Sequence, residues 1–236
     1  MLFRSENGIK MGKRFPEFVV NPSDIVRDYG ADTLRLYEMF MGPLEVSKPW
    51  STTGVMGAKK FINRVWNFFT EPQNITEEND GKLTKIYHQT VKKVTNDFET
   101  LGFNTAIAQM MVFVNEVYKN GSCPKAYAEG FIKMLSCVTP HVGEEIWQIL
   151  GHNDTIAYES WPVYSEEKCK DTEITMAVQV NGKLRGTVML PADSDDETVV
   201  AAALADEKVS RFLAKQEGTI RKTIVVKNKL VNLIVK

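Results

Sequence analysis

The first group of residues that could do chemistry is a short basic loop near the N-terminus. Lys10 and Lys13 flank Gly12 in a Lys-Met-Gly-Lys-Arg run that ends at Arg14, and Asn21-Pro22 starts a helix soon afterwards. Closely spaced cations on a flexible loop can close over the phosphates of a nucleotide and neutralise the charge that develops there. Lysine clusters are also common on solvated loops, and that interpretation stays open for this loop taken alone.

A second group lies in the C-terminal segment and would bind rather than catalyse. From Met176 to Lys236 the chain has ten Lys and Arg against seven Asp and Glu, although the formal net charge of the whole chain is −1. A basic segment of this kind suits a polyanion. The candidate contacts are Lys183, Arg185, Arg221, Lys222, Lys227 and Lys229. Cations that only keep an exposed sheet soluble are the alternative.

Motifs of self-contained enzymes are missing from the sequence. It has no G-x-S-x-G, Walker loop, G-x-G-x-x-G or H-E-x-x-H, and His88, His141 and His152 are scattered. Taken alone, the chain is therefore a poor enzyme candidate, and we predict no metal site.

Composition indicates a soluble globular protein. The hydrophobic fraction of 43% and charged fraction of 25% are ordinary, and no apolar run approaches the roughly 18 residues of a membrane span. The N-terminus lacks a signal-peptide pattern, and Cys123, Cys137 and Cys169 form no C-x-x-C pair. We expect a cytoplasmic protein with no membrane partner.

Helical signals fill the first two-thirds of the chain. Asn21 should cap a short helix that stops at Gly30, and a second helix should run from about Asp32 to Met41. Four further stretches with helical periodicity follow, at 55–69, 83–98, 107–118 and 131–149. Pro140 should kink the last of them. Turn-rich loops between these stretches predict an antiparallel helical bundle.

The period of the pattern changes after a charged segment at 165–175, which we interpret as a linker. Asn181-Gly182 between two apolar runs is a strong hairpin signal, and a second hairpin is expected around Lys227-Asn228-Lys229. One helix with an acidic first turn should lie between the hairpins. The expected fold is α+β, a bundle followed by a small ββαββ domain at 176–236.

Longer stretches of the chain match one family in sequence order. They are Lys10 to Lys13, 19–45, Lys48-Pro49-Trp50, Arg64-Val65-Trp66, Thr139-Pro140-His141 and 178–186. Together they resemble the leucyl-tRNA synthetases, which are class I aminoacyl-tRNA synthetases. The V-Q-V-N-G-K-L-R-G run at 178–186 favours the leucine enzyme over its valine and isoleucine relatives.

The resemblance implies roles for the basic loop. It implies that Lys10 and Lys13 are catalytic lysines that contact ATP, which would come with Mg²⁺, and that Met11, Gly12 and Arg14 complete the ATP loop. Gly12 and Arg14 stand where the family has serines.

The resemblance also implies a division of the chain. Residues 1–30 would end a catalytic domain, 31–164 would form an anticodon-binding-type helical domain, and 176–236 would grip leucine tRNA. The catalytic and editing domains of such a ligase are expected partners. Without them we expect no activity and no stably bound cofactor, because positioning is the larger part of the reaction. A free-standing RNA-binding or assembly module is the alternative.

Overall fold

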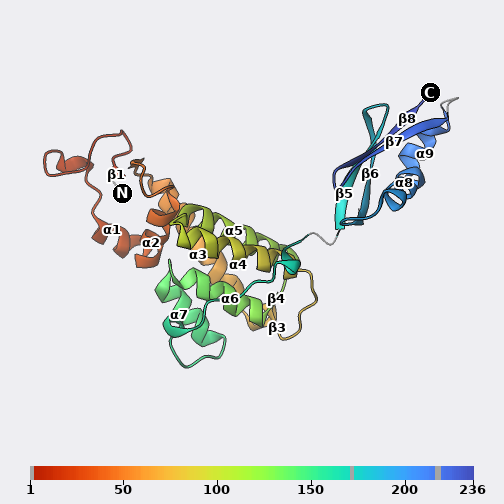
Figure 1. The fold of residues 1–236 in the computed structure, drawn as a ribbon. Helices are drawn as coiled ribbons and strands as arrows, with labels where there is room; N and C mark the ends of the chain where they lie inside the picture. The colour runs from red at the N-terminus through yellow and green to blue at the C-terminus, as the bar shows by residue number, and fades with distance from the viewer. Residues whose placement is uncertain (1–2, 171–172, 216–218) are drawn as a thin grey trace. The chain divides into compact units, whose positions relative to one another are not determined.

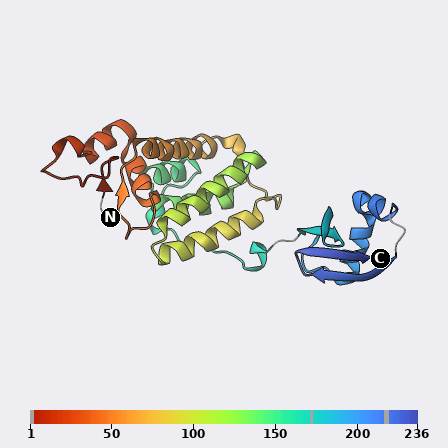
Figure 2. The same cartoon turned by 90° about the horizontal axis from the view of Figure 1, so that it is seen from above.

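The computed structural model describes residues 3–170, 173–215 and 219–236 of the chain. The chain divides into two compact units, Met1–Cys169 and Lys170–Lys236 (Figures 1 and 2). Within the described ranges, no helix is both long and apolar enough to cross a membrane. The first unit is mainly helical and the second combines a sheet with helices, so the α+β class is confirmed.

The first unit begins with short elements that lead into the bundle. They are β1 (Phe3–Arg4), η1 (Pro16–Phe18), α1 (Pro22–Tyr29), α2 (Ala31–Phe40) and β2 (Lys48–Pro49). Strands β1 and β2 pair in parallel. The side chain of Asn21 accepts a hydrogen bond from the backbone of Ser23, and Gly30 at φ 96° ends α1, both as the sequence predicts.

The bundle contains the helices that the periodic stretches predict, joined by short elements. They are α3 (Thr52–Phe69), η2 (Pro72–Asn74), β3 (Ile75–Thr76), α4 (Thr84–Glu99), α5 (Phe103–Asn120), β4 (Cys123–Pro124), α6 (Lys125–Ser136), α7 (Pro140–Ile149), η3 (Ile156–Tyr158) and η4 (Glu167–Cys169). Val91, Phe113 and Phe131 are fully buried where α4, α5 and α6 meet. One continuous apolar core therefore holds these helices together.

The stretch 131–149 is two helices, so the single kinked helix expected there was wrong. Thr139 leaves the helical conformation before Pro140, with φ −132° and ψ 69°, because a proline disfavours the helical conformation of the residue that precedes it. Pro140 then opens α7 at a position that needs no backbone donor. The N-terminus of α7 is capped from α2, since Asp32 accepts hydrogen bonds from the backbone of Val142 and from His141 Nδ1, both at 2.8 Å.

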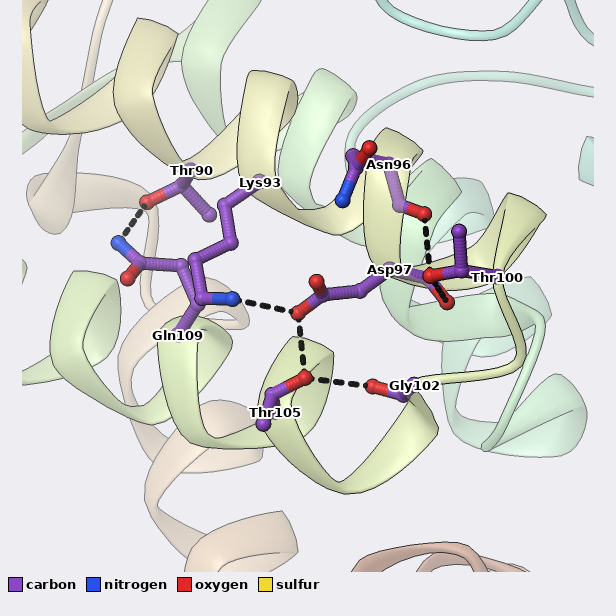
Figure 3. A network of polar contacts seen from close by, with 8 residues as sticks. All are labelled: Thr90, Lys93, Asn96, Asp97, Thr100, Gly102, Thr105 and Gln109. Carbon is purple, nitrogen blue, oxygen red and sulfur yellow. Dashed lines mark hydrogen bonds and ion pairs between the residues drawn. The ribbon is translucent and has the colours of Figure 1, made fainter. Parts of the chain in front are cut away.

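A polar network fixes the corner between α4 and α5 (Figure 3). Asp97 at the end of α4 is buried, and its Oδ2 accepts from Lys93 Nζ at 2.8 Å and from Thr105 Oγ1 at 2.6 Å. Leu101 turns the chain with φ 60°, a conformation that is strained for leucine. The buried carboxylate thereby ties the last turn of α4 to the first turn of α5.

Residues 161–169, here called the strap, lie along α4. Trp161 Nε1 donates to Thr95 Oγ1 at 2.7 Å, and the backbone of Ser165 donates to His88 Nδ1 at 3.2 Å. Lys92 pairs with Glu166 at 2.7 Å. The first part of the segment interpreted as a linker is therefore bound to the bundle. The last part of that segment, from Glu173, already belongs to a strand.

The second unit is a four-stranded sheet with two helices. Its elements are β5 (Glu173–Val180), β6 (Lys183–Pro191), α8 (Asp196–Ala205), α9 (Glu207–Leu213), β7 (Ile220–Val226) and β8 (Leu230–Val235). The strand order is β6-β5-β8-β7, with two antiparallel hairpins joined by the parallel pair β5–β8. Asn181 at φ 49° and Gly182 at φ 76° make the tight hairpin turn that the sequence predicts.

The helical layer contains two helices, so the single helix of the ββαββ expectation was wrong. Asp206 breaks the segment because its side chain accepts from the backbone of Lys208 and Val209, both at 3.0 Å, and so starts a new helix. Both helices cover one face of the sheet, where Val178 and Leu233 are fully buried. Figures 1 and 2 show α8 and α9 on the same side of the sheet. The opposite face exposes Leu184, Met189, Ile224 and Val226.

Candidate nucleic-acid interface

The basic loop at residues 10–14 ends in a tight turn. The backbone of Phe15 donates to the carbonyl of Gly12 at 3.0 Å, so Lys13 and Arg14 occupy the two corner positions. Lys10, Lys13 and Arg14 are all exposed. The guanidinium of Arg14 lies 5.6 Å from the ring centroid of Phe15. The loop thus presents its cations outward on a short, hydrogen-bonded turn.

Met11 holds this loop to the body of the first unit. It is half-buried and packs against the bundle core, while its neighbours on both sides face solvent. A Cβ added at Gly12 would meet nothing within 4 Å, and the φ of Gly12 lies outside the region that favours glycine. The conformational freedom of a glycine is therefore not required at position 12, and the serine that the family has there would fit.

The cations predicted to bind RNA in the second unit separate into two groups at opposite ends of the sheet. Because β5 and β8 run parallel, the turn at Asn181-Gly182 lies at one end and the turn at 227–229 lies at the other. The ends of β8, from Leu230 to Val235, are about 17 Å apart. Lys227 and Lys229 are at one end; Lys183, Arg185, Arg221 and Lys222 are at the other.

The group of four is itself divided between the two edge strands. Lys183 and Arg185 lie on β6, whereas Arg221 and Lys222 lie on β7, three strand spacings or about 14 Å away. Lys183 opposes the buried Val180 and so lies on the helix-covered face of the sheet. The six residues therefore rim the sheet and do not form one patch.

Lys227 differs from the other predicted contacts because an acid faces it. Its Nζ lies 3.1 Å from Asp193 Oδ1, in the loop between β6 and α8. The hydrogen bond from Lys227, followed by one from Asn228, lowers the pKa of Asp193 below its usual value. Asn228 also accepts from the backbone of Asp193 at 3.0 Å. This pairing fixes the β7–β8 turn and partly neutralises the cation at its corner.

Opposite charges occupy the two layers of the second unit. The hairpins at 173–191 and 219–236 contain seven cations and a single acid, Glu173. The segment 192–215, which contains both helices, has six acids and three cations, Lys208, Arg211 and Lys215. A polyanion would therefore be attracted to the strands and turns of the sheet more than to the helical layer as a whole.

A further exposed cation lies on the bundle and was missed by the sequence analysis. Arg64 on α3 donates to Asn115 Oδ1 at 2.9 Å, and its guanidinium lies 4.8 Å from the ring centroid of Tyr118 on α5. Tyr118 in turn donates to the carbonyl of Arg64 at 2.8 Å. The Arg64-Val65-Trp66 run was recognised only as part of the family resemblance. The two partners of Arg64, Asn115 and Tyr118, lie about fifty positions later in the chain. A guanidinium held in this way is ready to bind a phosphate.

Comparison with known proteins adds to this geometry. The family model described as the anticodon-binding domain of tRNA ligase matches residues 80–201, just over half of the chain. The chain belongs to this family. The matched region contains α4 to α7, the strap, the first hairpin of the sheet and the start of α8. The anticodon-binding family match thus extends across parts of both units.

A solved structure matches the anticodon-binding region and the rest of the chain together. It is the ternary complex LeuRS-tRNA-LeuAMS of Agrobacterium radiobacter K84, with a TM-score of 0.76 and 26% sequence identity. The match covers 100% of this chain and 33% of that chain, so this chain spans about a third of the length of that synthetase. The resemblance to leucyl-tRNA synthetases that the sequence motifs predict is confirmed.

Proposed function

We propose that this chain is the tRNA-binding part of a leucine–tRNA ligase, which joins leucine to its tRNA with ATP. The observation that supports this most strongly is the match over the full chain to a leucyl-tRNA synthetase solved with tRNA. The anticodon-binding family match supports the same role for the bundle. In this proposal the two units bind one tRNA at separate places.

The second unit contacts the sugar–phosphate backbone and does not stack on bases. Single-stranded RNA readers place aromatic rings under unstacked bases. From Lys170 to Lys236 the sequence has one aromatic residue, Phe212, which a guanidinium covers. The exposed cations at the sheet rim suit phosphate instead.

The basic loop serves the reaction only together with a nucleotide-binding domain. Lys10 and Lys13 would hold ATP phosphates from exposed positions on their turn, and Arg14 would add a third positive charge. Magnesium would accompany the nucleotide. A loop without the fold that orients leucine and ATP has no means of aligning the reacting atoms. The 236 residues alone should therefore show no leucine-dependent ATP–pyrophosphate exchange.

Charge removal in the full chain tests the binding role. The sheet variant K183Q/K222Q/K229Q and the helix-layer variant K208Q/R211Q/K215Q remove the same charge from the same unit. Binding of a leucine-accepting tRNA transcript is measured across a salt series. The sheet variant should bind at least about tenfold more weakly, with a salt slope reduced by roughly two. The helix-layer variant should resemble the unaltered chain. Equal losses in both variants, or none in either, would refute the proposal.

A further inference from the structure

Arg185 has an unusual position in the second unit. Val178 pairs with Gly186 and Gln179 pairs with Leu184, so Arg185 is the extra residue of a β-bulge in β6. A bulge redirects a side chain that would otherwise follow the strand alternation. Here the guanidinium carbon lies 3.8 Å from the ring centroid of Phe212 on α9. The bulge and the helix together give this arginine one defined orientation.

The charge of Arg185 is not used within the unit. Its Nε is buried without a hydrogen-bond partner, and within the described residues no ion pair involves its guanidinium. Asp206 lies nearby, since a Cβ at Gly186 would be 2.7 Å from its Oδ1. That oxygen already accepts from the backbone of Lys208 and Val209. Asp206 therefore caps α9 instead of pairing with the arginine.

We propose that Phe212 is a positioning residue that holds the guanidinium of Arg185 for one backbone phosphate of the bound RNA. This inference rests on the proposed function and assigns a part of its contact surface. A planar guanidinium matches two phosphate oxygens at once, and it stacks well on an aromatic face. A long side chain that is already ordered loses less rotamer freedom when the phosphate arrives.

The residues around the Arg185–Phe212 stack favour a phosphate, and not a base, as the group that Arg185 binds. Arg185 covers one face of Phe212, the single aromatic ring in the sequence of this unit, and Phe212 also packs against the apolar core, so the ring is not free to stack on a base. Lys183, two positions earlier and exposed, adds a second cation at the same end of the sheet. The pair and Lys183 thus favour the polyanionic backbone of an RNA.

A double-mutant cycle in the full chain tests the positioning role. R185Q, F212L, R185Q/F212L and F212Y are compared for binding of a leucine-accepting tRNA transcript over a salt series, with thermal unfolding measured for each. R185Q should weaken binding about tenfold and lower the salt slope by about one. F212L should weaken it about threefold, F212Y should restore it, and F212L should have no further effect beside R185Q.

The outcomes separate this inference from the function on which it rests. If F212L weakens binding equally with and without Arg185, Phe212 acts through the fold and the positioning role is wrong. If R185Q binds normally while K183Q/K222Q/K229Q does not, Arg185 contacts no phosphate but the sheet still binds RNA. If both bind normally, the proposed function fails as well.

Discussion

At the level of single residues, the side chain of Asp97 links the end of α4 to the start of α5. Its carboxylate is buried and accepts from Lys93 and Thr105. Replacing Thr105 with valine keeps the shape but removes the 2.6 Å hydrogen bond to a charged group. Hydrogen bonds of this type contribute about 1.5–3 kcal/mol, so T105V should lower the free energy of unfolding by about that amount. Urea denaturation of the full chain measures it.

Thr100 offers a matched control for this prediction. Its hydroxyl donates to the carbonyl of Asn96 at the exposed end of α4, and such bonds contribute little to helix stability. T100V should change the free energy of unfolding by less than about 0.5 kcal/mol. Equal effects of T105V and T100V would mean that Asp97 does not depend on the Thr105 hydroxyl.

At the level of elements, the strap should respond to pH through His88. Burial, and then the charge of Lys168, lower the pKa of His88 below its usual value. Its Nδ1 accepts from the backbone of Ser165, and a protonated ring has no acceptor to offer. A depressed pKa adds stability above the unfolded value of about 6.5, and that stability is lost as the pH falls. Amide exchange, corrected for intrinsic rates, should show less protection of 161–169 at pH 5 than at pH 7.5.

A non-titrating acceptor separates His88 from other acid effects on the strap. Groups that face it include the rings of Tyr87 and Tyr127 and the charge of Lys168. Asparagine places Oδ1 near the position of Nδ1, so H88N should keep the strap bound at both pH values. The same loss of protection in H88N would assign the pH effect to a group other than His88.

Local signals predicted many elements because their causes lie within a few residues. The cap at Asn21, the stop at Gly30 and the turn at Asn181-Gly182 depend on short-range backbone chemistry. The break before Pro140 is stabilised by Asp32, 110 positions from Val142, and no local pattern contains that contact. Residues 165–169 of the strap were likewise interpreted as part of a linker, because their charged side chains show no hydrophobic period and their contacts are with α4, far away in the sequence.

The candidate site was predictable in residue type and not in geometry. Charge alone indicated the six predicted contacts among the cations of the second unit, and the structure places all six on strands or turns. Their division between two ends follows from the parallel pairing of β5 with β8, which a list of hairpins does not reveal. The stack of Arg185 on Phe212 needs both a bulge and a second helix, and neither was expected.

At the level of the whole molecule, removing one acid should strengthen RNA binding. Asp193 pairs with Lys227, and asparagine would keep the acceptor for Asn228 and tolerate the φ of 63° at this position. Asp193 offsets the charge of Lys227 at this turn, so D193N should bind a leucine-accepting tRNA transcript about threefold more tightly at low salt. Filter binding or fluorescence anisotropy gives this ratio.

Glu207 provides the comparison that separates location from net charge. It pairs with Arg211 in the helical layer at 3.4 Å, and E207Q removes the same charge from the same unit. Its affinity for the transcript should stay within about twofold of the unaltered chain, and the gain of D193N should vanish at high salt. An equal gain in both variants would show that net charge, and not the β7–β8 turn, controls binding.

The separation of charge between the sheet and the helices also has a kinetic consequence. A unit with cations in one layer and acids in the other is an electric dipole, and the field of a polyanion exerts a torque on it before any atoms touch. Under the proposed function, the unit would turn its sheet toward the RNA during diffusion, so a larger share of encounters would begin in the productive orientation. In that proposal, salt acts mainly on the rate of association, while the lifetime of the complex depends on close contacts such as the one proposed for Arg185.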